Sequence, residues 1–204
     1  MLTLYGDPHS GNCYKVQLLL TLLEKSWRWH TIDILAGGSR SSEFLLLNPN
    51  GRVPVLVLED GRALTESNAI LYFLAIESAY LPVDPFARAC VLQWQAFEQY
   101  SHEPFIATSR FIRRYLGNPP DRAADLAARQ APGHAALAVM EQRLRDHAFF
   151  VAERYSIADI SLYAYTHVAE EGGFSLARFP AVRAWLARVA TCPGHVPMNA
   201  PPPA

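Results

Sequence analysis

The chain has 204 residues, 50% of them hydrophobic, and its 18 basic and 19 acidic side chains give a formal net charge of −1. At roughly 150 residues per domain, this length fits one large domain or two small ones, with ample apolar material for a core. A near-neutral charge provides no field that would attract nucleic-acid phosphates or anionic lipid. Nucleic acid and membrane surfaces are therefore excluded as first choices of partner.

The start of the chain has no basic region before an apolar stretch and carries Asp7, so it does not read as a signal peptide. The longest apolar runs, such as 69–76, fall far short of the roughly 20 residues that span a bilayer. The three cysteines are widely spaced without a CxxC pair, and the histidines lack metal-ligand spacing. We expect a cytoplasmic protein with no disulfide framework and no metal.

The first part of the chain alternates short strand-like and helix-like segments, which predicts a βαβ unit followed by a hairpin and a closing helix. Asp60-Gly61 suits a two-residue hairpin turn, in which both central residues adopt positive φ. The expected strands cover 2–5, 27–34, 53–58 and 62–64, and the expected helices lie around 16–23, at 42–47 and from about residue 66.

Beyond residue 86 the apolar spacing becomes helical almost throughout, which predicts helices at 86–116, 122–146, 157–170 and 180–191. Ser156-Ile-Ala-Asp159 has the form of a helix capping box. The tail from 193 holds five of the 15 prolines and should be irregular. The expected division is 1–77 as one domain, 78–86 as a linker, 87–192 as an all-helical domain and 193–204 as the tail.

Three polar clusters in the first domain are candidates for chemistry. Ser10-Gly11-Asn12-Cys13 lies between a strand and a helix, where the helix N-terminus favours an anion such as a thiolate. Glu66-Ser67 opens the next helix, in its first turn, where the hydroxyl and N–H of Ser67 suit a carboxylate and Glu66 suits an ammonium. Helix capping is the alternative for both.

The third cluster is Asn48-Pro-Asn-Gly-Arg-Val-Pro54, directly before a strand. A proline there is tolerated at a sheet edge. The backbone of Val53 is then available to pair with an extended peptide, and a cis Val53–Pro54 bond would fix that edge. An ordinary turn is the alternative.

In order and spacing, these clusters and the capping box resemble the soluble glutathione transferases, over roughly residues 1–192. The motifs are Ser10-x-x-Cys13-x-x-Val16, Asn48-Pro-x-Gly51-Arg-Val-Pro54, Glu66-Ser67 and Ser156-Ile-Ala-Asp159. The resemblance, closest to serine-type bacterial members, implies an α/β thioredoxin-like N-terminal domain and an all-α C-terminal domain. It also implies glutathione as co-substrate, and a homodimer.

The resemblance assigns roles along glutathione. Glu66 and Ser67 would hold the γ-glutamyl end, Val53 before cis Pro54 would pair with the cysteinyl backbone, and Arg52, with Arg40, would bind the glycyl carboxylate. Ser10 would donate a hydrogen bond to the sulfur and so favour the thiolate, with Asn12 as a second donor. Cys13, one turn into the helix, is interpreted as a small buried hydrophobe.

The second substrate would sit between the domains, on the long helix after the linker. Pro104 can kink that helix and turn side chains toward the cleft. The residues expected there combine aromatic surface with a few donors, namely Tyr100, Ser101, His102, Phe105 and Arg110.

The sequence thus predicts a glutathione transferase that conjugates the activated thiol to a small hydrophobic electrophile. The Ser10/Asn12 pair resembles that of bacterial members, some of which reduce disulfides with glutathione. A glutathione-dependent disulfide or peroxide reductase at the same site is therefore one alternative. A non-catalytic glutathione-binding or interaction protein is the other.

Overall fold

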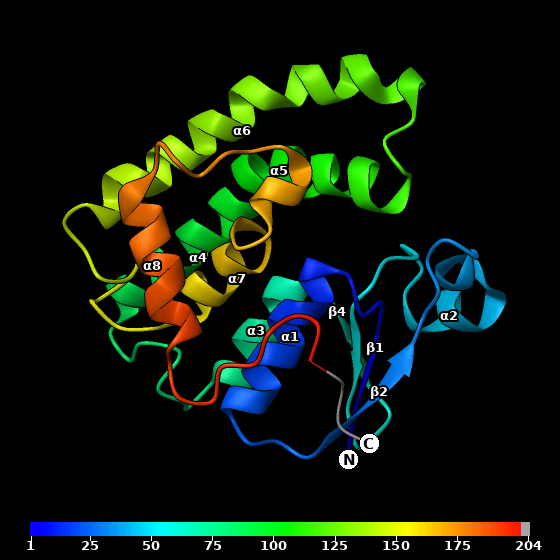
Figure 1. Ribbon diagram of the computed structural model, residues 1–204. Coiled ribbons are helices and arrows are strands. Elements are labelled where there is room, and N and C mark those ends of the chain that lie inside the picture. The colour runs from blue at the N-terminus through cyan, green and yellow to red at the C-terminus, as the bar shows by residue number, and fades with distance from the viewer. Residues whose placement is uncertain (201–204) are drawn as a thin grey trace. The chain divides into compact units, whose positions relative to one another are not determined.

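The computed structural model of the protein describes residues 1–200, so the end of the predicted tail, 201–204, lies outside the described residues. The chain divides into two compact units (Figure 1). Unit 1 comprises Met1–Ser78 together with the C-terminal segment that begins at Pro193, and unit 2 comprises Ala79–Cys192. The first boundary falls within the proline-containing segment 78–86, and the C-terminal segment belongs to unit 1 rather than standing apart.

Unit 1 is a four-stranded mixed sheet with helices on both faces (Figure 1). Its strands are β1 (Leu2–Gly6), β2 (Trp27–Thr31), β3 (Val55–Val57) and β4 (Ala63–Thr65). Its helices are α1 (Gly11–Leu22), the 3-10 turn η1 (Gly38–Arg40), α2 (Ser42–Leu47) and α3 (Ser67–Ala75). The strand order is β2-β1-β3-β4, with β1 and β2 parallel and β3 antiparallel to both of its neighbours. This is the thioredoxin-like arrangement that the sequence predicts.

Strand alternation divides the apolar residues of unit 1 between the two faces of the sheet. Val55 packs with Phe44 of α2 and with Ile32 in one cluster. Leu56, the next residue along β3, is fully buried and points to the opposite face, which α1 and α3 cover. The helices α1 and α3 also pack against each other. The βαβ unit therefore buries α1 against β1 on one side and α3 on the other.

The hairpin between β3 and β4 differs from the predicted two-residue turn. Gly61 has φ +86°, whereas Asp60 is not among the residues with positive φ. The Gly61 N–H donates to the Leu58 carbonyl at 3.0 Å, and the Leu58 N–H donates to the Arg62 carbonyl at 2.8 Å. The connection is therefore a three-residue loop, a turn followed by one left-handed residue that glycine adopts without strain.

Unit 2 is built from helices, as the sequence predicts. They are α4 (Pro85–Phe97), the π-helical turn η2 (Glu98–His102), α5 (Glu103–Arg110), a second π-turn η3 (Phe111–Tyr115), the 3-10 turn η4 (Pro120–Arg122), α6 (Ala123–Leu144), α7 (Ile157–Thr166), the 3-10 turn η5 (Ala169–Gly172) and α8 (Pro180–Ala190). The predicted helix 157–170 is thus split, because α7 ends at Thr166 before η5 begins.

The long helical stretch from 85 to 115 changes its winding immediately before Pro104. Proline has no N–H to give to the carbonyl four residues earlier, and its ring clashes with that carbonyl in a regular α-helix. The wider turn of η2 lies where this conflict arises. The predicted kink is therefore a π-turn.

Asp159 joins three separate parts of unit 2. Its carboxylate accepts hydrogen bonds from the Ser156 N–H at 3.0 Å, the Phe150 N–H at 3.1 Å and the Trp185 indole N–H of α8 at 3.0 Å. Both halves of the predicted capping box are present. Burial raises the pKa of Asp159 to about 6, although these donors act to lower it. The box therefore caps α7 and also fixes the preceding loop and α8.

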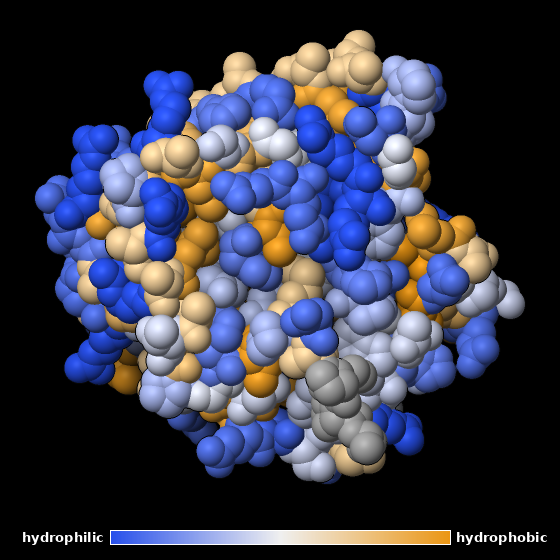
Figure 2. All heavy atoms as spheres, in the orientation of Figure 1, coloured by the Kyte–Doolittle hydropathy of each residue, from blue (hydrophilic) through white to orange (hydrophobic). Residues whose placement is uncertain are grey.

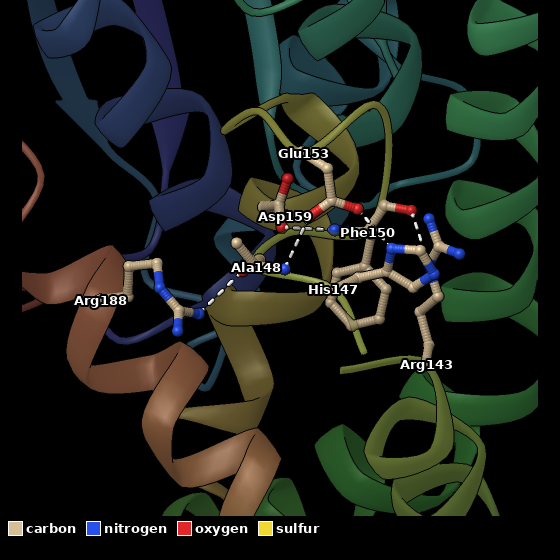
Figure 3. A network of polar contacts seen from close by, with 7 residues as sticks. All are labelled: Arg143, His147, Ala148, Phe150, Glu153, Asp159 and Arg188. Carbon is tan, nitrogen blue, oxygen red and sulfur yellow. Dashed lines mark hydrogen bonds and ion pairs between the residues drawn. The ribbon is translucent and has the colours of Figure 1, made fainter. Parts of the chain in front are cut away.

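The loop before α7 is held by a second set of polar contacts beside Asp159 (Figure 3). The Glu153 carboxylate accepts the Ala148 N–H at 2.8 Å and pairs with the His147 imidazole. Arg188 of α8 donates to the Ala148 carbonyl at 2.8 Å. These contacts tie the loop to α8 at a second point.

No helix within residues 1–200 is long and apolar enough to cross a membrane. On the face that Figure 2 shows, hydrophobic residues are interspersed with hydrophilic ones.

We predict that Asp159→Ala lowers the free energy of unfolding by about 3 to 5 kcal/mol, because it leaves three buried N–H groups without an acceptor. Urea unfolding of the full chain measures this. Asp146→Ala is the control, because Asp146 is exposed and its replacement should cost less than about 0.5 kcal/mol. Equal losses in the two variants would contradict the role given to Asp159.

Candidate functional site

Strand register brings the three clusters singled out in the sequence to one edge of the sheet. Tyr5, near the end of β1, pairs with Val55, the first residue of β3. Val55 also pairs with Thr65, the last residue of β4. The turn after β1, the Val53–Pro54 segment before β3 and the Glu66–Ser67 segment after β4 therefore emerge at the same edge.

Ser10 is the N-cap of α1, in an extended backbone conformation. Its hydroxyl oxygen accepts a hydrogen bond from the Cys13 N–H at 3.4 Å, and its own N–H donates to the Asp7 carbonyl at 3.1 Å. The cap uses a lone pair of the oxygen and not the hydroxyl hydrogen, so capping by itself does not prevent donation. Capping and donation to a ligand are therefore compatible at Ser10.

Ser67 and Asn12 join the N-terminal turns of α3 and α1. The Ser67 hydroxyl, nearly buried, donates to the Asn12 side-chain oxygen at 3.2 Å. The Ser67 hydroxyl therefore does not cap α3. The bond is accepted by the amide oxygen of Asn12, and donation from that side chain to a ligand would use its nitrogen.

Glu66 lies immediately before α3, at the N-cap position, and not within the first helical turn as predicted. Its φ is +64°, a conformation that non-glycine residues rarely adopt, and its side chain makes no capping bond. The side chain is exposed. Unusual backbone at an exposed acidic residue is a feature that binding sites often carry.

The segment from Asn48 to Pro54 is organised by Asn48, a residue to which the sequence analysis gave no role of its own. Its buried side chain accepts the Asn50 N–H at 3.1 Å and donates to the Arg52 carbonyl at 2.7 Å. The Val53–Pro54 peptide bond is cis, as expected. An asparagine that reaches two and four residues ahead signals such a turn, since Asn side chains readily bond to nearby backbone.

Arg40 and Arg52 are both exposed on unit 1. The Arg40 guanidinium donates to the Asn50 carbonyl at 3.1 Å and covers Gly51, where a Cβ atom would lie 2.5 Å from a guanidinium nitrogen. Gly51 is favoured by its φ of +63° and by the Ser39 carbonyl oxygen, which would lie 2.9 Å from a Cβ atom. One of the five N–H groups of Arg40 is used, and the guanidinium is anchored to the loop.

Cys13 is fully buried beneath the turn after β1, with Gly6 against its thiol. Burial raises the pKa of the Cys13 thiol to about 12, although the bonds with Ser10 and Asp7 act to lower it. This supports the interpretation of Cys13 as a buried hydrophobe. Within the described chain, no group of three His, Cys, Asp or Glu side chains has metal-binding geometry.

Two residues expected at the second-substrate site are buried inside unit 2. The His102 imidazole lies 2.9 Å from the Thr166 hydroxyl, which gives its own hydrogen to the Leu162 carbonyl at 2.6 Å. His102 is therefore the donor, through Nε2. Arg110 donates to the Glu171 carboxylate at 2.8 Å and is 3% exposed. These contacts favour structural roles for both side chains.

The other three expected residues are accessible to different degrees. Tyr100 is 86% exposed, whereas Ser101 and Phe105 are half-buried. Tyr100 and Ser101 belong to the π-turn η2, and Phe105 lies in the first turn of α5.

We predict that a maleimide modifies Cys90 and Cys192 in the native protein at pH 7.5 but leaves Cys13 unmodified. Cys90 and Cys192 are half-buried, whereas Cys13 is inaccessible and its thiolate is disfavoured. Mass spectrometry of peptides from native and denatured samples measures this. Modification of native Cys13 as fast as that of the other two would contradict its burial and reopen a redox role.

Comparison with known proteins identifies the family. Residues 9–76 match the glutathione S-transferase N-terminal domain and residues 90–193 match the C-terminal domain. A glutathione S-transferase from Pseudomonas fluorescens is 54% identical, with a TM-score of 0.95 over 97% of this chain and 98% of that one. A glutathione transferase from Burkholderia graminis, solved with two glutathione molecules per subunit, is 26% identical, with a TM-score of 0.82 over 95% and 85%. Disulfide-bond oxidoreductase YfcG of Escherichia coli is 28% identical over 95% of this chain and 92% of YfcG. The chain belongs to the glutathione S-transferase family of enzymes.

Proposed function

We propose that the protein binds glutathione at the edge of the unit 1 sheet, stabilises its thiolate through Ser10 and conjugates it to a small hydrophobic electrophile. The observation that carries this proposal is the arrangement at Ser10. Its hydroxyl caps α1 with a lone pair, so the cap itself does not use the hydroxyl hydrogen. It also lies at the positive end of the helix dipole, where a negative charge is favoured.

A hydrogen bond from Ser10 to sulfur favours the thiolate over the thiol, and therefore lowers the pKa of the bound thiol. A free thiol has a pKa near 8.5 and is only a few per cent ionised at pH 7. Each unit of lowering raises the reactive fraction nearly tenfold until ionisation is complete. Ser10 acts as a donor here and not as a base or nucleophile. Asn12, two residues further on, is a second donor for the same atom.

The two ends of glutathione differ in charge, and the site offers a partner for each. At the γ-glutamyl end, the N–H of Ser67 starts a helix and lacks an intrahelical acceptor, so it suits the carboxylate, while the Ser67 hydroxyl gives its hydrogen to Asn12. The exposed carboxylate of Glu66 suits the ammonium. At the glycyl end, Arg40 and Arg52 suit the second carboxylate. The backbone of Val53, next to cis Pro54, pairs with the cysteinyl residue by strand-like bonds.

The electrophile is proposed to contact Tyr100, Ser101 and Phe105, which combine aromatic surface with a hydroxyl donor. His102 and Arg110 act on it only indirectly, because internal partners hold them. A homodimer in the cytoplasm is the proposed state of the enzyme.

We predict that Ser10→Ala lowers kcat/KM for conjugation to a chlorinated aromatic about 10- to 100-fold, because a hydrogen bond to a charged group is lost. The ultraviolet absorbance of the bound thiolate, followed against pH, should show a raised pKa of the bound thiol. Ser10→Thr, which keeps both the cap and the donor, should retain most activity. Cys13→Ala is the matched control and should keep its activity. If Cys13→Ala lost activity while Ser10→Ala kept it, Ser10 would not be the residue that activates the thiol.

A second candidate function is the reduction of disulfides by glutathione at the same site. The similarity to the disulfide-bond oxidoreductase of Escherichia coli favours it. Two glutathione thiols supply the two electrons and two protons that convert a disulfide to two thiols, and leave as glutathione disulfide. Cys13 is too deeply buried to take part, so both sulfurs must come from glutathione.

Three substrates separate the candidate functions. Turnover of a chlorinated aromatic supports the transferase, and turnover of only a disulfide or hydroperoxide supports the reductase. Retention on immobilised glutathione without any turnover would instead indicate a binding protein. Loss of retention in Ser67→Ala is expected in each case.

A further inference from the structure

The C-terminal segment 193–200, called the strap below, is folded back onto unit 1. It has no regular secondary structure, and one internal bond runs from the Ala200 N–H to the Pro197 carbonyl at 2.9 Å. The chain enters it directly from α8, yet it groups with the thioredoxin-like unit. Figure 1 shows this red segment running along α1.

Tyr14 of α1 is the main point of attachment. Its ring is 1% exposed, and its hydroxyl donates to the Val196 carbonyl at 2.7 Å. The same hydroxyl lies 3.4 Å from Nε2 of His195. Because the phenol has a single hydrogen and gives it to Val196, the contact with His195 requires Nε2 to carry a proton. Two consecutive strap residues, His195 and Val196, therefore both contact the Tyr14 hydroxyl.

Two further contacts extend the attachment along the helix. Gly194 adopts φ +80°, and a Cβ atom there would lie 3.3 Å from Leu22 at the last turn of α1. The amide of Gln17, one turn after Tyr14, donates to the Ala200 carbonyl at 3.4 Å. Tyr14 and Gln17 are three residues apart and share one helix face. The strap therefore contacts α1 from its first turn to its last.

The covered helix is the one whose first turn forms the candidate site. Ser10 caps α1, Asn12 accepts from Ser67, and Tyr14 follows within the same turn. Because α1 is a rigid helix, contacts that fix Tyr14 also fix the backbone of this turn. We propose that the strap holds α1 in place and that Tyr14 is the positioning residue through which it sets Ser10 and Asn12. The proposal rests on the function proposed above.

Two variants of the full chain loosen the strap from opposite sides. Tyr14→Phe removes only the hydroxyl, and Gly194→Val introduces a side chain against Leu22 and strains the backbone. Tyr72→Phe on α3 is the control for the first. Gly61→Val is the control for the second, because Gly61 has a similar φ of +86° and open space around it.

Hydrogen–deuterium exchange of the ligand-free protein reports on α1, and calorimetry reports on glutathione affinity. We expect exchange of the α1 amides and the Kd for glutathione to rise about 3- to 10-fold in Tyr14→Phe and Gly194→Val, with little change in the controls. The double variant should be no worse than the more severe single one, since both release the same segment.

Unchanged α1 exchange in Tyr14→Phe overturns the proposal even if Gly194→Val fails to fold. Faster exchange with an unchanged Kd overturns the positioning role, because the strap would then only stabilise the helix. If the wild-type protein binds no glutathione, the proposed function fails, and the strap is judged by exchange alone.

Discussion

The hydrogen bond from Ser67 to Asn12 joins the first turns of α1 and α3, and the candidate site depends on it. Each helix presents N–H groups without intrahelical acceptors at its start, and each start carries a partial positive charge. Strand register brings the two starts to one edge of the sheet, and the bond fixes them to each other. The proposed function places a small peptide with two carboxylates and a thiol against these donors. The near-neutral net charge of the chain is thus less informative than the placement of Arg40, Arg52 and Glu66.

Local sequence patterns predicted the elements well, since their periodicity is set within a few residues. The strands and the capping box at Ser156–Asp159 appear close to their expected positions, whereas the expected helices 86–116 and 157–170 are each divided. What local patterns could not decide was the use of each polar side chain. Ser10 and Ser67 both stand at a helix start, yet only Ser10 caps; Ser67 donates to a residue 55 positions away. Such a contact depends on strand register, which a helix-start pattern does not encode.

The same limit applies in unit 2. The resemblance and the place of the long helix after the linker led us to expect His102 and Arg110 at the second-substrate site. Their partners, Thr166 and Glu171, are more than 60 residues away in sequence, so the spacing around them carried no sign of the pairing. The strap was likewise expected to be irregular because of its prolines. It is irregular over 193–200, but Tyr14 and Gln17 hold it in place by donating to the Val196 and Ala200 carbonyls.

Two sulfur atoms were possible centres of the chemistry, that of Cys13 and that of a ligand. The burial of Cys13 and the rise of its pKa to about 12 argue against Cys13, and the proposed function places the chemistry on the ligand's sulfur. The central claim is that Ser10 donates to this sulfur. A crystal structure of the protein with glutathione bound tests it most directly. The account predicts the sulfur within about 3.5 Å of the Ser10 hydroxyl oxygen. A sulfur that contacts only Asn12, or lies away from the start of α1, would contradict it.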